Sequence, residues 1–267
     1  MLPYASDVTT VRIVPKESGD DVKVSATSYL SFKRCPAGAN ARYQGIYGPD
    51  SRPGFAGSLA HRIFSRHLSS GAIASDDFVQ ACREEIGGSS LVNKMGGLEL
   101  KPSVLAGVIE EVRELYERFT KFPQDGFEGT EVELRLAPAD GVELVGTVDA
   151  IYREELGGHR LVDWKTGELG DVESQLLFYA LLWALDRDEV PAYVEAVSIR
   201  TGERYRAVPS SADIDRVAAD VAAMIDVLRR LWASGEEFDR SGGPWCRYCP
   251  ILEGCGEGEA TVRILSS

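Results

Sequence analysis

Residues 159–168, HRLVDWKTGE, place a carboxylate and an ammonium group two positions apart at the end of an alternating apolar segment. Side chains at positions i and i+2 of a strand point to the same face of the sheet, so Asp163 and Lys165 are expected to emerge together. On a protein surface, such a pair is an ordinary salt bridge that contributes little to stability. Beside a second carboxylate, the same pair could serve a metal ion and a phosphate.

A second carboxylate, Asp149, interrupts the apolar segment 142–152 (VELVGTVDAIY). Burying a carboxylate is unfavourable unless a partner or a metal ion compensates its charge. If the two segments form a hairpin through the turn region 153–159, Asp149 and Asp163 face each other near one edge of the sheet. Two converging carboxylates suit a hard cation such as Mg²⁺ or Mn²⁺, and Lys165 beside it could orient an attacking water.

Three further side chains could complete this site. Gln175 and Tyr179 are four positions apart in the predicted helix 171–187, so they share one helix face. A glutamine on a face that packs against a sheet is unusual for core, whereas a tyrosine there is ordinary core. His61 follows Gly57 by four positions in another predicted helix, where a lone histidine is usually structural or exposed.

Two more acidic residues, Glu131 and Glu133, lie in the segment that precedes the hairpin. Alternation predicts both on one face of the strand. They could add to the metal site, and a solvated edge strand explains them equally well.

The cysteines indicate a second centre. Cys246, Cys249 and Cys255 cluster near the end of the chain, and three thiols need a fourth ligand to close a tetrahedral zinc site or to hold a four-iron cluster. Cys82 lies in a predicted helix, where a buried free thiol is ordinary. Cys35 lies in a loop and, like Cys249, precedes a proline, so Cys35 is the predicted fourth ligand.

The composition indicates one large domain, or one domain with a small appendage, in a soluble, cytoplasmic protein. The chain has 267 residues, is 44% hydrophobic and carries a net charge of −13. Residues 1–66 hold nine basic and five acidic residues, against 20 and 37 in the remainder, so local phosphate contacts are possible without general polyanion binding. The N-terminus lacks the basic and apolar regions of a secretory signal, and no apolar run reaches the roughly 18 residues of a membrane span.

Periodicity and turn residues predict an α/β sheet flanked by helices. The expected elements are a capped helix at 25–34, a loop at 44–57, helices at 57–71, 75–87 and 102–122, a β-meander of strands at 130–136, 142–152 and 160–167, a helix at 171–187, a strand at 191–203 and a helix at 210–235.

The motifs, taken in order, resemble the PD-(D/E)XK nuclease superfamily, closest to its RecB-like exonuclease branch. The resemblance spans roughly residues 25–256 and implies a restriction-endonuclease-like mixed central sheet flanked by helices. It also implies roles: His61, Asp149 and Asp163 ligate Mg²⁺ or Mn²⁺, Lys165 positions the attacking water, and the remaining two residues support the site or the DNA. The motif residues are His61, Gly146-Thr147-Val148-Asp149, Asp163-Trp164-Lys165-Thr166-Gly167, Gln175 and Tyr179.

The distant Cys35 and the C-terminal trio resemble the iron–sulfur staple of AddB-type subunits and small CRISPR-associated exonucleases. This implies a structural [4Fe–4S] cluster that joins the chain ends, with zinc as the alternative because thiolates suit both. The predicted layout is a single nuclease domain (1–267) with a cysteine cluster lobe (25–56 plus 240–267), a helical segment (57–128) and a nuclease core (129–239).

Basic and aromatic residues near Cys35, namely Lys33, Arg34, Arg42 and Tyr43, are predicted to contact single-stranded nucleic acid. Core packing with solvated charges explains them equally well. The chain has no phosphate-binding loop of the helicase type. The predicted function is a metal-dependent DNA exonuclease acting on single strands or DNA ends in repair, recombination or CRISPR-related processing, with a helicase or CRISPR-adaptation partner. The alternatives are a non-catalytic nucleic-acid-binding or assembly subunit and a zinc-binding structural protein.

Overall fold

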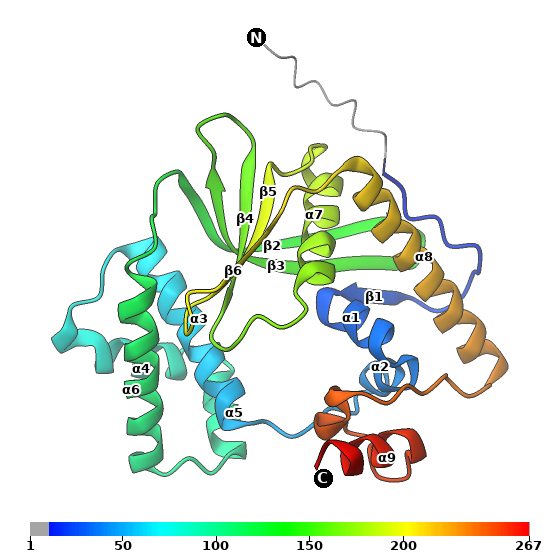
Figure 1. Cartoon of the computed structure of the whole chain (residues 1–267), viewed down its shortest axis with the longest axis horizontal. Helices are drawn as coiled ribbons and strands as arrows, with labels where there is room; N and C mark the ends of the chain where they lie inside the picture. Colours follow the sequence, from blue (N-terminus) through cyan, green and yellow to red (C-terminus); the bar gives the residue numbers. More distant parts are fainter. Residues whose placement is uncertain (1–10, 267) are drawn as a thin grey trace.

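The structure is a computed structural model that describes residues 11–266. In this part of the chain, a six-stranded mixed sheet carries helices on both faces (Figure 1). In chain order the elements are β1 (Val22–Ser25), α1 (Ala26–Arg34), α2 (Pro36–Tyr43), α3 (Arg52–Ser70), η1 (Ser75–Asp77), α4 (Phe78–Gly87), α5 (Leu91–Gly97), α6 (Pro102–Phe119), β2 (Phe127–Ala139), β3 (Val142–Arg153), β4 (His159–Lys165), α7 (Glu173–Arg187), β5 (Tyr193–Ser198), β6 (Arg204–Ala207), α8 (Ser211–Ser234), η2 (Pro244–Tyr248) and α9 (Gly256–Leu265).

The predicted meander is confirmed: β2 pairs antiparallel with β3, and β3 with β4. β5 adds parallel to β4, and β6 closes that side of the sheet antiparallel to β5. β1 pairs with residues 142–145 of β3 and β4 pairs with residues 150–153, while β2 runs along nearly the whole strand. Residues 146–149 of β3 therefore pair with neither β1 nor β4. Side chains in this stretch can contact elements other than those two strands.

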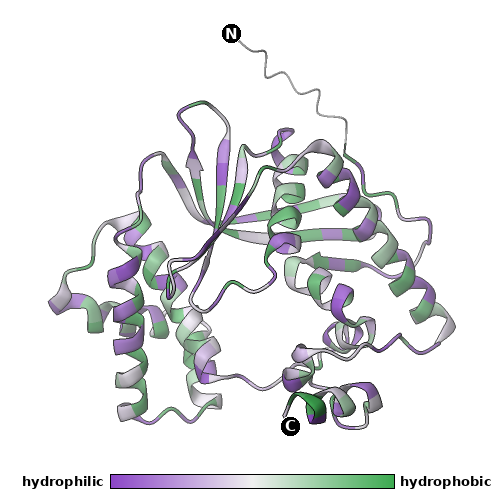
Figure 2. Cartoon of the chain, viewed as in Figure 1, coloured by the Kyte–Doolittle hydropathy of each residue, from purple (hydrophilic) through white to green (hydrophobic). Residues whose placement is uncertain are grey.

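Two hydrophobic cores cover the two faces of the sheet. Leu161 of β4 belongs to the core under α1, α7 and α8, whereas its neighbour Val162 belongs to the core under α3, α4 and α6. This alternation follows from the two-residue period of a strand. Figure 2 shows α7 largely apolar, as expected for a helix buried on most sides, whereas α6 and α8 alternate between polar and apolar residues.

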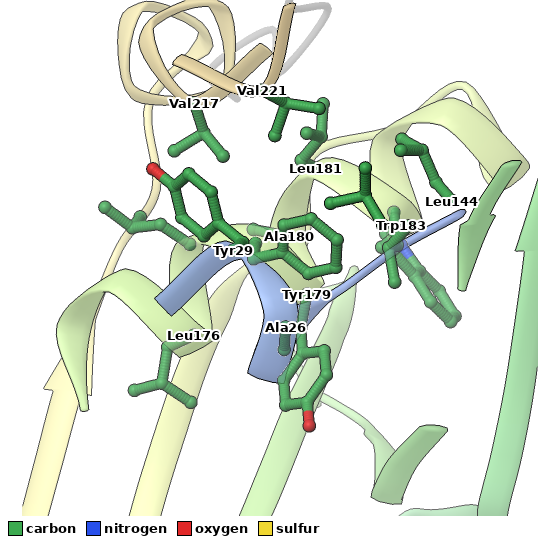
Figure 3. Close-up of a cluster of buried hydrophobic side chains, with 14 of the residues drawn as sticks. Ala26, Tyr29, Leu144, Leu176, Tyr179, Ala180, Leu181, Trp183, Val217 and Val221 are labelled. Carbon is green, nitrogen blue, oxygen red and sulfur yellow. The ribbon is translucent and has the colours of Figure 1, made fainter. Parts of the chain in front are cut away.

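Helix α1 is fastened to this first core by one aromatic side chain. Tyr29 stacks on Phe178 of α7 at 5.6 Å between ring centroids. Its hydroxyl hydrogen-bonds to Asp220 of α8 at 3.1 Å. Figure 3 shows the ring between Val217 of α8 and Ala180 of α7, so α1 links the two helices that cover this face.

The structure corrects several predicted elements. The predicted loop 44–57 ends at residue 51, because Ser51 accepts a hydrogen bond from the Gly54 amide at 3.2 Å and Pro53 lies in the first turn, which starts α3 early. The predicted strand 191–203 ends at Ser198, and a turn leads into the separate strand β6. The short elements β1, α2, α5 and α9 were not predicted, since four to ten residues give little periodicity.

The domain boundaries stay a prediction. The sheet reaches beyond residues 129–239, because β1 joins it. The N-terminal and C-terminal parts of the predicted cysteine lobe do meet, since a Cβ atom at Gly48 would lie 3.0 Å from the Tyr248 carbonyl oxygen. Within residues 11–266, no helix has both the length and the apolar character to cross a membrane. Residues 1–10, on which the expectation about a secretory signal rests, lie outside the described part.

Candidate functional site

The predicted hairpin brings Asp149 and Asp163 to the point where the pairing of β3 and β4 ends. Ala150 lies opposite Val162, so the two aspartates are the next residues in register. The Trp164 amide donates to Asp149 Oδ2 at 2.7 Å. This point lies between two inner strands rather than at an edge of the sheet, because β5 and β6 extend the sheet beyond β4.

Three side chains from separate elements converge beside this hairpin. The ligand atoms of His61 on α3, Glu131 on β2 and Asp149 on β3 all lie within 4.8 Å of one another. His61 Nδ1 is 3.2 Å from Asp149 Oδ1. We call these three residues the ligand cluster. One imidazole nitrogen and two carboxylates suit Mn²⁺ or Mg²⁺.

Glu131 enters the ligand cluster because β2 is irregular at this position. Its φ of 50° is rare for a residue other than glycine and interrupts the alternation of the strand. Burial, then the charge of Asp149, raises the pKa of Glu131. Glu133 instead pairs with the exposed Arg135 at 2.9 Å, so Glu131 is the one of the two glutamates that lies in the ligand cluster.

A hydrogen-bonded chain holds the ammonium group next to the cluster. Lys165 Nζ lies 2.8 Å from Gln175 Oε1 and 2.8 Å from Asp163 Oδ2. Gln175 Nε2 donates to Asp163 Oδ1 at 2.9 Å and to the Tyr179 hydroxyl at 3.0 Å. Asp163 Oδ2 is buried and accepts no hydrogen bond beyond its ion pair with Lys165, and Asp163 lies outside the ligand cluster. Its role as a metal ligand stays a prediction.

The charges in the site shift the pKa values of its side chains. Burial alone would lower the pKa of His61, but Asp149, supported by Asp163 and Glu131, raises it to about 9. Burial and the charge of Asp149 raise the pKa of Asp163 to about 6, against the opposing effect of Lys165. His61 therefore holds a proton at neutral pH that a bound cation would displace.

The two motif glycines permit close approach of neighbouring elements. A Cβ atom at Gly57 of α3 would lie 3.0 Å from Thr166 Oγ1, just after β4. A Cβ atom at Gly146 of β3 would lie 2.4 Å from Leu182 Cδ1 and 3.4 Å from Tyr179 Cε1 of α7. Glycine at these positions lets α3 carry His61, and α7 carry Tyr179, up to the ends of β3 and β4.

The four cysteines of the predicted second centre surround one cavity of about 750 Å³, although they come from opposite ends of the chain. Burial, together with the other three cysteines, raises the pKa of Cys249. Within residues 11–266, no three cysteine sulfurs lie within 4.8 Å of one another. Cys82 is fully buried in the core under α3 and α6, as predicted. The four residues at the cavity are Cys35, Cys246, Cys249 and Cys255.

Three of the four predicted nucleic-acid contacts, Lys33, Arg34 and Arg42, line this same cavity. Tyr43 differs: its ring packs edge-on against Trp232 at 5.5 Å, and its hydroxyl donates to the Lys23 carbonyl at 3.0 Å. Tyr43 is therefore a packing residue between α2 and α8. The sequence pattern could not separate it from an exposed tyrosine, because α2 was not predicted.

Comparison with known proteins now decides the family. The family model of the PD-(D/E)XK nuclease superfamily matches residues 23–256. This chain belongs to that superfamily. Among solved structures, it is similar to a protein of Eubacterium rectale named as a candidate exonuclease, at 11% identity and a TM-score of 0.52 over 81% of this chain and 83% of that one. It is also similar to a protein named SSO0001, at 14% identity and a TM-score of 0.41 over 90% of this chain and 88% of that one.

At these identities, the likeness of a PD-(D/E)XK chain to solved structures supports the fold alone, and the second score is too low to add to it. No curated protein sequence matches the chain. The predicted restriction-endonuclease-like mixed sheet flanked by helices agrees with the family and with the observed topology.

Proposed function

We propose that this PD-(D/E)XK nuclease is a metal-dependent DNA exonuclease of the RecB-like branch that hydrolyses phosphodiester bonds in single strands or at DNA ends. The observation that carries the proposal is the placement of Lys165. Its ammonium group is held by Gln175 and Asp163 beside the ligand cluster. The RecB-like branch further suggests a cytoplasmic role in repair, recombination or CRISPR-related processing, with a helicase or CRISPR-adaptation partner.

Lys165 is oriented so that one donor remains for the reaction. An ammonium group has three N–H donors; Gln175 accepts one of them, and Asp163 Oδ2 lies 2.8 Å away as the partner of an ion pair. The third can hold the attacking water or a phosphate oxygen as negative charge develops on it. A divalent cation in the ligand cluster would neutralise charge on the phosphate and lower the pKa of its bound water.

Tyr179 is oriented through the same chain. Its hydroxyl accepts a hydrogen bond from Gln175 Nε2, which leaves its own proton available to donate. Burial and the nearby carboxylates raise the pKa of Tyr179, so the hydroxyl stays protonated and can donate to a phosphate oxygen.

The test is cleavage of end-labelled single- and double-stranded DNA by the purified protein with Mg²⁺ or Mn²⁺. The Lys165→Met variant should cut at least about a hundred-fold more slowly than the parent. The Lys101→Met variant is the matched control, because Lys101 is exposed at the start of α6, and it should cut at the parental rate. Equal rates for Lys165→Met and the parent would exclude this mechanism. A parent that binds DNA but does not cut it would instead favour the non-catalytic subunit.

We further propose that the four cavity cysteines hold a [4Fe–4S] cluster rather than zinc. Zn–S bonds of about 2.3 Å place the sulfurs of a tetrahedral site only about 3.8 Å apart. No three cysteine sulfurs between residues 11 and 266 come within 4.8 Å of one another. Gly258 keeps the space beside one of these sulfurs open, since a Cβ at this position would lie 3.3 Å from Cys255 Sγ.

Iron and sulfide analysis tests the cluster. The purified parent should be brown and contain both elements, and Cys35→Ala should lose them. Cys82→Ala should keep them, because Cys82 is buried in the core under α3 and α6 and lies away from the cavity. A colourless parent that contains zinc would overturn this proposal.

A further inference from the structure

In the described part of the chain, the exposed aromatic side chains gather in one place. Among residues 11–266, only three aromatic side chains count as exposed: Tyr47 at 66%, Trp245 at 36% and Tyr248 at 81%. Large aromatic rings are usually buried, and grouped exposure marks a binding surface more often than chance. Nothing in the nuclease mechanism above uses these rings.

The three rings come from two segments that are far apart in sequence. Trp245 and Tyr248 both lie on η2. Tyr47 lies in the connection between α2 and α3, and a Cβ at the next residue, Gly48, would lie 3.0 Å from the Tyr248 carbonyl oxygen. Figure 1 shows this connection running from the region of α2, past the orange segment, toward α3. We call the three rings the aromatic platform.

Cationic side chains without acidic partners surround the platform. Lys33, Arg34, Arg42 and Arg240 line the cysteine cavity together with Trp245 and Tyr248, against one acidic residue, Asp171. None of the four forms an ion pair with a carboxylate in the part of the chain that the structure describes, although the protein has a net charge of −13. Guanidinium and ammonium groups that are not paired with a carboxylate are the partners that phosphates bind.

The platform is connected to the catalytic centre through the start of α7. Lys33 Nζ donates to Ser174 Oγ at 3.1 Å. Ser174 also lines the cavity and directly precedes Gln175, the residue that holds Lys165. The cationic residues therefore contact the same end of α7 that holds Lys165.

We propose that the aromatic platform binds unpaired bases of the strand being cut, while the surrounding cations bind its phosphates. This inference rests on the proposed nuclease function and narrows its substrate to single-stranded DNA. Unpaired bases expose their faces for stacking on tyrosine and tryptophan, whereas the bases of a duplex are already stacked on one another. A blunt duplex end therefore gains nothing from the platform.

Binding is measured by fluorescence anisotropy with an oligothymidylate of about 12 nucleotides, a length that spans one such surface. Every protein carries Lys165→Met, so that cleavage does not interfere, and visible absorbance verifies that each keeps any cluster. Tyr248→Ala should weaken binding about ten-fold, while Tyr248→Phe should stay within about two-fold of the parent. Arg42→Gln should lower the slope of log affinity against log salt by about 0.7. Leu156→Ala, which removes a fully exposed apolar side chain from the β3–β4 turn, should change nothing.

Equal affinity of Tyr248→Ala and Tyr248→Phe would overturn the inference, and it is also the result expected if the rings bind another protein. A blunt duplex that binds as tightly as the oligothymidylate, with the same dependence on Tyr248, would overturn it too. Either failure leaves the nuclease proposal standing if the parent still cuts DNA. If binding depends on Tyr248 but the parent cuts no DNA, the nuclease proposal is rejected and the binding role of the aromatic platform stands.

Discussion

Gly146→Ala is expected to destabilise the protein, although it adds a single methyl group. The new Cβ would lie 2.4 Å from Leu182 Cδ1, whereas carbon atoms in contact prefer about 3.5–4.0 Å. Leu182 is fully buried in the core under α7 and α8, so it has no free space in which to move. Either the side chain of Leu182 or the whole of α7 must therefore shift.

The expected magnitude follows from two opposing terms. Forcing an extra methyl group into a packed core costs about 1–3 kcal/mol. Replacing glycine by alanine also restricts the unfolded chain, which returns about 0.4–1 kcal/mol. The free energy of unfolding should therefore fall by about 1–2 kcal/mol.

Urea unfolding of the parent, Gly146→Ala, Leu182→Ala and the double variant measures this effect. Leu182→Ala alone should cost about 2–5 kcal/mol through the cavity it leaves. In that background the methyl group at position 146 has room, so adding Gly146→Ala should cost little or stabilise the protein. The cycle should thus show coupling of about 1–2 kcal/mol. A parental midpoint for Gly146→Ala, or an equal loss in both backgrounds, would refute the close-approach explanation.

Two further predictions concern protonation and the N-terminal segment. The folded protein raises the pKa of His61 from 6.5 to about 9, so metal-free protein should lose stability as pH rises from 6.5 to 9, and His61→Asn should flatten this slope in thermal melts. Mn²⁺ should bind more tightly over the same range and release protons at pH 7, which calorimetry in two buffers detects; binding without proton release would contradict the assignment. The buried Arg229 donates to carbonyl oxygens of segments 17–20 and 140–141, so Arg229→Met should cost about 3 kcal/mol or more, whereas the exposed neighbour Arg230→Met should stay within about 0.5 kcal/mol.

Local periodicity predicted much of the candidate site. The two-residue period of β4 placed Asp163 and Lys165 on one face, and the structure joins them at 2.8 Å. The helical period placed Gln175 beside Tyr179, and they are hydrogen-bonded. These relations depend on backbone geometry within a single element, which steric constraints restrict to a few forms. A sequence therefore reveals them without knowledge of what packs nearby.

Only the tertiary structure decided which side chains share an atom-scale site. Glu131 joins His61 and Asp149 through a backbone irregularity that no spacing rule predicts, while Asp163 is engaged by Gln175 and Lys165. In the cysteine lobe, exposure separates Tyr47 from Tyr43, which have similar sequence surroundings. Burial and partner choice are set by elements far apart in the chain, so they emerge only when those elements pack. The sequence by itself determined that Asp163 and Lys165 could serve a nuclease. The packing of α3, β2 and α7 around this pair decided which other residues lie next to it.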